Sequence, residues 1–162
     1  MLSRKSIRKF TNEAVRDASV EALLKSAMQA PSARNQQPWE FYVIKNRALI
    51  KALSQVSGGA KPLEQAPIAI MPVIKADVPA PHMCPQDLAA STQNILLAAT
   101  DEGLGAVWIG VFPLEDRIAK VRDIIDLPKS ITPFCMIAVG HPDQPTNVEK
   151  LRYDASRVKV IK

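Results

Sequence analysis

The sequence contains few aromatic residues and few cysteines, and each shortage argues against a class of protein. Phe, Trp and Tyr make up 5% of the 162 residues, whereas a small nucleic-acid binder combines a basic face with interleaved aromatic side chains. The formal net charge of +5 is therefore more typical of a mildly basic surface or of an anionic ligand. The two cysteines, Cys84 and Cys135, lie far apart without metal-ligand spacing, so the sequence predicts neither a secreted disulfide framework nor a metal site.

Long hydrophobic runs are also missing. The longest apolar stretch, residues 66–74, is about half as long as a membrane span requires, and it contains Pro67 and Pro72. The amino-terminal residues are charged from Arg4 onward and lack the apolar core of a signal peptide. These features predict a soluble, cytoplasmic protein.

Neither a repeat nor a linker divides the chain, so residues 1–162 are predicted to form a single domain. Apolar residues recur at helical spacing after Asp17, which we interpret as the N-cap of a helix that ends at Pro31. Asn46 is predicted to cap a second helix that Gly58 and Gly59 close. Two further helices are expected over 86–102 and 114–125, and four strands over 39–44, 66–74, 106–111 and 131–139.

Three segments allow predictions about their position or regularity in the fold. The helix over 86–102 is apolar around most of its circumference, which predicts a central, buried position. Pro72 fits poorly inside a strand because proline cannot donate to the ladder, so the far end of the 66–74 strand is doubtful. From Gly140 the chain is polar and proline-rich and is expected to form an extended tail. The mixture of helices and strands predicts an α+β fold with one sheet.

Arg4-Lys5-Ser6-Ile7-Arg8 places closely spaced cations around a hydroxyl group. This composition suits a phosphate, which accepts charge-assisted hydrogen bonds from cations and one from a hydroxyl. A solvated basic terminus would account for the same residues.

Three other segments are candidates for ligand binding. Residues 30–39, Ala-Pro-Ser-Ala-Arg-Asn-Gln-Gln-Pro-Trp, form a row of amide and hydroxyl groups that could read the edge of a flat heterocycle, although polar turns have a similar composition. Gly110 lies inside a strand pattern, where glycine often marks the close approach of a backbone or ligand. Lys150 and Arg152 are two residues apart in the extended tail, so they would point the same way.

Taken in this order, the segments resemble the nitroreductase family of FMN enzymes from Arg4 to about Arg152. The most specific parts are the residues 31–39 and the segment 87–110, which includes Gln93-Asn94-Ile95-Leu96-Leu97 and Trp108-Ile109-Gly110. The resemblance implies a nitroreductase-like central mixed β-sheet flanked by helices. It also implies an intertwined homodimer with two FMN sites at its interface.

The resemblance assigns roles to individual residues. It implies that Arg4, Ser6 and Arg8 bind FMN, that Lys5 contributes through its backbone, and that Lys150 and Arg152 lie near the phosphate. It implies that the other subunit contributes Pro31, Ser32, Ala33 and Asn35 to the flavin site, and that Ile109 and Gly110 lie at the ring. Gln93 and Asn94 are expected to be buried and structural. No protein side chain is expected to be catalytic, and no metal is expected.

The implied activity is reduction of nitroaromatics, quinones or related acceptors by NAD(P)H in a ping-pong cycle, with FMN tightly bound. The chain shows no long insertion over its middle, so an open site with broad acceptance is expected. The open alternatives are a flavin-binding protein without turnover and a flavin reductase, dehalogenase or dehydrogenase. A basic nucleic-acid binder is a further alternative, and its affinity would fall steeply with salt. The segment 79–85, with His82, matches no motif.

Overall fold

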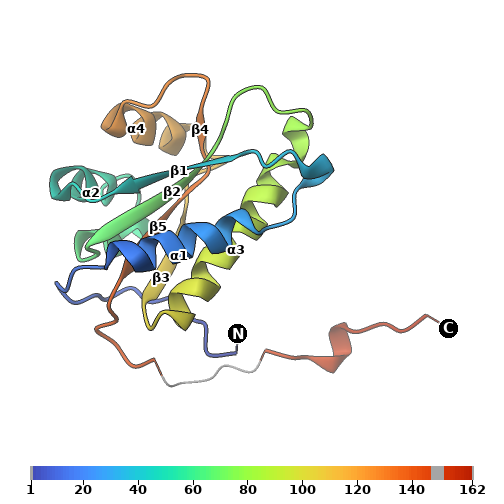
Figure 1. The fold of residues 1–162 in the computed structure, drawn as a ribbon, viewed down its shortest axis with the longest axis horizontal. Coiled ribbons are helices and arrows are strands. Elements are labelled where there is room, and N and C mark those ends of the chain that lie inside the picture. The colour runs from blue at the N-terminus through green and yellow to red at the C-terminus, as the bar shows by residue number, and fades with distance from the viewer. Residues whose placement is uncertain (1, 147–151, 162) are drawn as a thin grey trace.

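The computed structural model describes residues 2–146 and 152–161, and it has helices on both faces of one β-sheet (Figure 1). The strands are β1 (Trp39–Ile44), β2 (Ile68–Ile74), β3 (Gly105–Gly110), β4 (Thr132–Pro133) and β5 (Cys135–Gly140). The α-helices are α1 (Asp17–Met28), α2 (Arg47–Leu53), α3 (Cys84–Asp101) and α4 (Glu115–Ile125). Four 3-10 segments complete the structure: η1 (Ala33–Asn35), η2 (Gly58–Glu64), η3 (Pro81–Met83) and η4 (Ala155–Arg157). Among the described residues, no helix is long and apolar enough to cross a membrane.

The sheet has the strand order β1-β2-β5-β3, and β4 also pairs with β2. All four pairings between these strands are antiparallel, so the expected mixed sheet is wrong. A parallel contact occurs only as an isolated bridge between Ser6 and Ala106 in the described chain. A helix between two strands permits a parallel crossover but does not require one. The α+β class and the flanking helices are confirmed.

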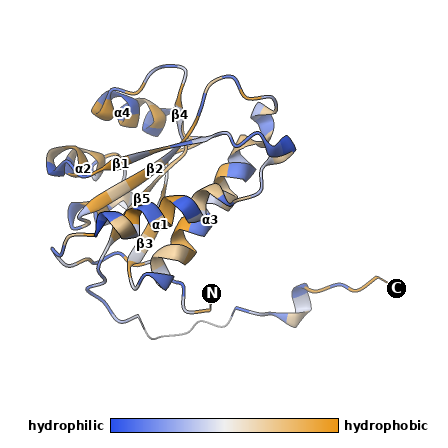
Figure 2. Cartoon of the chain, viewed as in Figure 1, coloured by the Kyte–Doolittle hydropathy of each residue, from blue (hydrophilic) through white to orange (hydrophobic). Residues whose placement is uncertain are grey.

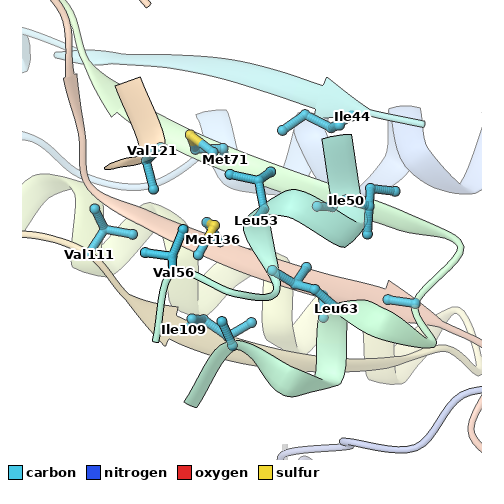
Figure 3. Close-up of a cluster of buried hydrophobic side chains, with 14 of the residues drawn as sticks. Ile44, Ile50, Leu53, Val56, Leu63, Met71, Ile109, Val111, Val121 and Met136 are labelled. Carbon is cyan, nitrogen blue, oxygen red and sulfur yellow. The ribbon is translucent and has the colours of Figure 1, made fainter. Parts of the chain in front are cut away.

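Each face of the sheet carries its own hydrophobic core. Side chains alternate between the faces along a strand, so Ile68 and Ile70 pack toward α1 and α3, whereas Ala69 and Met71 pack toward α2, η2 and α4. Figure 3 shows the second core, in which Leu53 lies near Met71. Hydrophobic residues follow β2 and the inner sides of the helices in Figure 2. Burial on both faces explains why the β2 sequence is continuously apolar.

The helix caps agree only in part with the sequence pattern. Asn46 caps α2 as predicted, because its Oδ1 accepts the N–H groups of Ala48 at 2.9 Å and Leu49 at 3.2 Å. Asp17 is instead the first residue of α1, after an extended Arg16 that makes no side-chain cap. The second helix ends at Leu53 rather than at the glycine pair, because residues 58–64 form a separate 3-10 segment.

Pro72 lies within β2, so the doubt about the end of this strand was wrong. The β2–β5 ladder ends at the pair of Ile70 with Ile137, and pairing resumes between Val73 and Pro133 of β4. Between the two ladders, the carbonyl of Pro72 accepts the N–H of Phe134 at 3.0 Å. The N–H that proline lacks therefore falls at a break in the pairing, and the same break divides the single strand expected over 131–139.

The amino-terminal segment lies along β3, and Gly105 allows this close approach. The N–H of Ile7 donates to the carbonyl of Ala106 at 3.0 Å. A Cβ atom at Gly105 would lie 2.6 Å from Cγ2 and 2.7 Å from Cβ of Ile7, closer than these atoms can approach. The two backbones can therefore pack together only where residue 105 has no side chain.

Replacing Gly105 with Ala is expected to destabilise the fold by about 1–3 kcal/mol, because the added methyl overpacks the contact with Ile7. Thermal unfolding of the flavin-free protein measures this as a lowered Tm. The matched control is Gly59→Ala, whose Cβ would meet nothing nearer than Ser57 Oγ at 3.9 Å. Equal melting temperatures for the two variants would show that the amino-terminal segment does not pack on β3.

Candidate functional site

The predicted basic segment is held against the body of the protein. Gln144 Oε1 accepts the backbone N–H groups of Arg8 at 2.9 Å and Lys9 at 3.2 Å, and the N–H of Asp143 donates to the Lys9 carbonyl at 2.9 Å. Ser6 bridges to Ala106 on β3. The segment therefore runs between the edge of the sheet and residues 141–144, and these contacts fix the backbone that carries its cations.

These cations are divided between two cavities. Arg8 and Lys9 line a cavity of about 410 Å³, whereas Lys5 lines another of about 390 Å³ that Thr100 and Gly103 border. In an extended segment, residues two apart point the same way, so Arg4 and Ser6 share the side opposite to Lys5. Arg4, Lys5 and Ser6 are all half-buried, and Arg8 is exposed.

The 410 Å³ cavity is positively charged. Lys61 of η2 joins Arg8 and Lys9 around it, against the single carboxylate of Glu64. Glu64 Oε1 already accepts a hydrogen bond from Gln55 Nε2 at 3.0 Å. The remaining lining residues are Gly58, Gly59, Pro62 and Gln65. Three cations around one carboxylate favour an anionic ligand such as a phosphorylated or carbonyl-rich molecule.

Lys61 was missed by the sequence analysis. The run Gly58-Gly59-Ala60-Lys61 was interpreted only as the end of a helix. A cation two residues after a flexible glycine pair was the available signal. Its relation to Arg8, more than 50 positions away in the sequence, is visible only in the folded chain.

Gly110 and Ile109 have different surroundings on the edge strand β3. The carbonyl of Ala106 faces outward, because it accepts the N–H of Ile7. Backbone direction alternates along a strand, so the N–H of Gly110 also faces outward, whereas that of Ile109 faces β5. Nothing lies within 4 Å of a Cβ position at Gly110, and Arg117 Nη1 donates to its carbonyl at 2.9 Å. Gly110 can therefore present an N–H group to a ligand, while the Ile109 side chain is buried in the core.

Within the predicted segment 30–39, residues 31–37 form a loop with an unusual backbone at the amino-terminal end of α3, which we call the 31–37 loop. Arg34, Asn35 and Gln37 have φ values of 54°, 53° and 45°, a left-handed conformation that residues other than glycine rarely adopt. Ser32 Oγ accepts the N–H of Gln37 at 3.0 Å, and Asn35 Oδ1 accepts a hydrogen bond from Gln37 Nε2 at 3.1 Å. Pro31 is exposed, and Ser32 and Ala33 are half-buried.

The loop and the basic segment lie at opposite ends of α3. The N–H of Ala33 donates to Asp87 in the first turn of α3, whereas Lys5 shares its cavity with Thr100 in the last turn. About 20 Å of helix separates Asp87 from Thr100. One chain therefore does not bring these two groups of predicted residues together.

Of the two predicted carboxyl-terminal residues, the structure describes only Arg152. Lys150 lies outside the described residues, and Arg152 is exposed. The tail 152–161 extends away from the helices and sheet (Figure 1). Tyr153 is 82% exposed and Ile161 is 97% exposed, although both are large and apolar. Hydrogen bonds from Ser156 lower the pKa of Asp154, a contact made within the tail itself.

A groove of about 660 Å³ runs between α1 and α3, and Ser26, Leu97 and Asp101 are among its lining residues. Asn94 is structural as predicted, because its Nδ2 donates to the Ser26 carbonyl at 3.0 Å. The expectation that Gln93 is buried was wrong, since it is exposed. Helix α3 packs on the sheet and on α1 but is not enclosed on all sides, and Gln93 lies on its uncovered side.

Neither cysteine is a candidate nucleophile. Burial raises the pKa of the Cys135 thiol to about 12. Burial, together with the negative charge of Asp87, also raises the pKa of Cys84. Both groups are therefore protonated thiols at neutral pH, and the thiolate is the reactive form. His82, in η3, is exposed.

A family model described as the nitroreductase family matches residues 1–67 and 57–141. The chain belongs to the nitroreductase family. A protein of Methanothermobacter thermautotrophicus, provisionally named NADH dehydrogenase/NAD(P)H nitroreductase, is 35% identical over 161 residues, which cover 99% of this chain and 84% of that protein.

Solved structures of related proteins share the fold. A provisionally assigned NADH oxidase of Clostridium acetobutylicum superposes with a TM-score of 0.96 at 42% identity, covering 99% of this chain and 98% of that one. A provisionally assigned nitroreductase of Desulfovibrio desulfuricans, solved in complex with FMN, gives a TM-score of 0.81 at 28% identity and covers 99% and 93% of the two chains. The relatives carry the names of oxidoreductases, so the family is one of redox enzymes.

Proposed function

We propose that this protein is an FMN-dependent oxidoreductase that uses NAD(P)H to reduce nitroaromatics, quinones or related small acceptors. The observation that carries the proposal is the positively charged cavity of Arg8, Lys9 and Lys61, formed where the amino-terminal segment meets η2. Segment η2 packs against β3, whose edge presents the N–H of Gly110. The protein of Desulfovibrio desulfuricans with the same fold was solved in complex with FMN.

The residues present fit FMN. A flavin phosphate requires cations and hydroxyl donors, and its ring requires a donor on an open surface. Arg4 and Ser6 would supply the first set, with Lys150 and Arg152 near the phosphate and the backbone of Lys5 as a further contact, whereas Arg8 and Lys61 would lie beside the ring. Gly110 supplies the ring contact, because its N–H faces outward and the space above its Cα is free. Ile109 contributes by fixing β3 to the core below it.

A second copy of the chain completes the site. The 31–37 loop is about 20 Å from the basic segment along α3, so Pro31, Ser32, Ala33 and Asn35 would reach the flavin from the partner subunit. The exposed apolar tail supports the same homodimer, because its side chains find no burial on their own chain. Its Arg157 and Lys159 complement Asp101 and Glu102 in the α1–α3 groove. An isologous interface then forms two equivalent sites.

When bound, FMN supplies the capacity to accept a hydride and to pass electrons on. The chain binds and orients it, and no side chain is required as a nucleophile or proton donor. Arg8 would stabilise negative charge beside the ring, and the N–H of Gly110 would donate a hydrogen bond to it. No long insertion covers the site, so NAD(P)H and the acceptor are proposed to occupy the same open position in turn. This gives ping-pong kinetics and broad acceptance.

The purified protein is expected to be yellow, and extraction should release FMN in a ratio of about one per chain. Double-reciprocal plots of NAD(P)H oxidation at several quinone concentrations are expected to be parallel, as a ping-pong cycle requires. A colourless protein that does not bind added FMN would disprove the proposal. A yellow protein without turnover would indicate the flavin-binding alternative, and a panel of nitro, quinone, flavin and halogenated acceptors would separate the possible substrates.

A further inference from the structure

Asp87 is a buried carboxylate that the proposed chemistry does not use. It is 5% exposed and lies in the first turn of α3. None of the ion pairs among the described residues includes it. Burying a charge is unfavourable unless it is hydrogen-bonded, so this carboxylate requires hydrogen-bond donors around it. The amino-terminal end of the α3 dipole favours its negative charge.

Both oxygens of Asp87 are bound to the 31–37 loop. Oδ1 accepts the backbone N–H of Ala33 at 2.9 Å, and Oδ2 accepts a hydrogen bond from Gln36 Nε2 at 2.7 Å. Gln36 is itself buried, and its amide also pairs with the backbone of Ala80, accepting from the N–H at 2.9 Å and donating to the carbonyl at 3.1 Å. The orientation of the Gln36 side chain is therefore determined at both ends, with its nitrogen facing Asp87.

The loop held in this way has the left-handed backbone described above. Such a conformation persists in residues other than glycine only where the surroundings impose it. Asp87 contacts the loop at Ala33 and Gln36, on either side of Arg34 and Asn35. Because Asn35 Oδ1 faces Gln37, its amide nitrogen is the end turned away from that contact. The carboxylate thus contacts the loop on both sides of two residues that have the left-handed backbone.

We infer that Asp87 is a positioning residue of the flavin site, whose buried carboxylate holds the 31–37 loop in the conformation that contacts FMN bound to the partner subunit. The inference rests on the proposed function for its effect on FMN. The holding of the loop itself does not depend on flavin.

The experiment compares Asp87→Asn and Asp87→Ala with the control Asp123→Asn, which changes an exposed carboxylate on α4. Asn keeps an acceptor for the Ala33 N–H but loses the charge, whereas Ala loses both contacts. We expect the FMN Kd, measured by fluorescence quenching in the folded dimer, to rise about tenfold for Asn and further for Ala. The control should bind FMN as the wild type does.

Hydrogen exchange of the flavin-free proteins tests the loop separately. Residues 33–37 are expected to lose protection in Asp87→Asn, while β2 and β5 keep theirs. A lowered Tm with unchanged FMN Kd and unchanged loop protection would overturn the inference, because it would show a purely structural role. If the wild type binds no FMN, the proposed function fails, and the exchange measurement still decides whether Asp87 holds the loop. Should Asp87→Ala fail to fold, the more conservative Asn variant provides both measurements.

Discussion

Replacing Arg8 and Lys61 together with Ala is expected to raise the Kd for FMN by about 100-fold. The double change removes two of the three cations of the 410 Å³ cavity and leaves Lys9 opposite Glu64. Hydrogen bonds to charged groups contribute about 1.5–3 kcal/mol each, and solvent screening places these exposed groups at the lower end. About 3 kcal/mol for the pair corresponds to about 100-fold in affinity. The Kd is measured by titrating the flavin-free protein with FMN and following fluorescence quenching.

The single variants separate the two contributions. Each is expected to weaken FMN binding about tenfold, and Lys51→Ala, on the exposed side of α2, is the matched control for loss of a cation. Arg8→Ala should also lower the two-electron reduction potential by about 20–40 mV, since about 1.4 kcal/mol corresponds to 30 mV. Wild-type affinity in the double variant would show that the cavity does not hold the flavin.

If the protein is the proposed homodimer, ending the chain at Thr146 is expected to convert it into a monomer and to abolish FMN binding at micromolar concentrations. The truncation removes the tail, in which Tyr153, Val160 and Ile161 are 82%, 77% and 97% exposed. Burying an apolar side chain of this size contributes about 1.5–3 kcal/mol, so loss of several would weaken the proposed interface by several kcal/mol. Light scattering coupled to size exclusion measures the mass.

A second variant separates the tail's apolar contacts from its charges. Val160→Asp with Ile161→Asp keeps Lys150 and Arg152, and it should still give a monomer. The control is Leu114→Asp, which places the same charge on an apolar residue that is 43% exposed outside the tail. Asp is favourable at this position because Leu114 is the N-cap of α4. A truncated protein that remains dimeric would show that the tail does not join the subunits.

Much of the fold could be predicted from short-range patterns. The strand Trp39–Ile44 and the cap at Asn46 were correct, since the strand preference of aromatic and β-branched residues and helix capping are both local properties. The errors involve distant partners. Pro72 is compatible with β2 because Phe134 interrupts the facing ladder. Gln93 is exposed because no element among the described residues covers that side of α3.

In the candidate site, too, local motifs indicated some residues, whereas others were identified only from contacts in the folded chain. The motifs indicated the basic segment, the 31–37 loop and Gly110, and these assignments to FMN stay predictions. Lys61 and Asp87 were missed as site residues, because each acquires its role from residues far away in the sequence.

The sequence by itself determined the family, the positions of most helices and strands, and the residue types available to hold an anionic flavin, because these depend on local periodicity and motif order. Only the tertiary structure decided that the strands run antiparallel, that Arg8 and Lys61 line one cavity, and that the loop and the basic segment lie at opposite ends of α3. These features are contacts between segments distant along the chain, and their geometry arises only when both hydrophobic cores pack on the sheet.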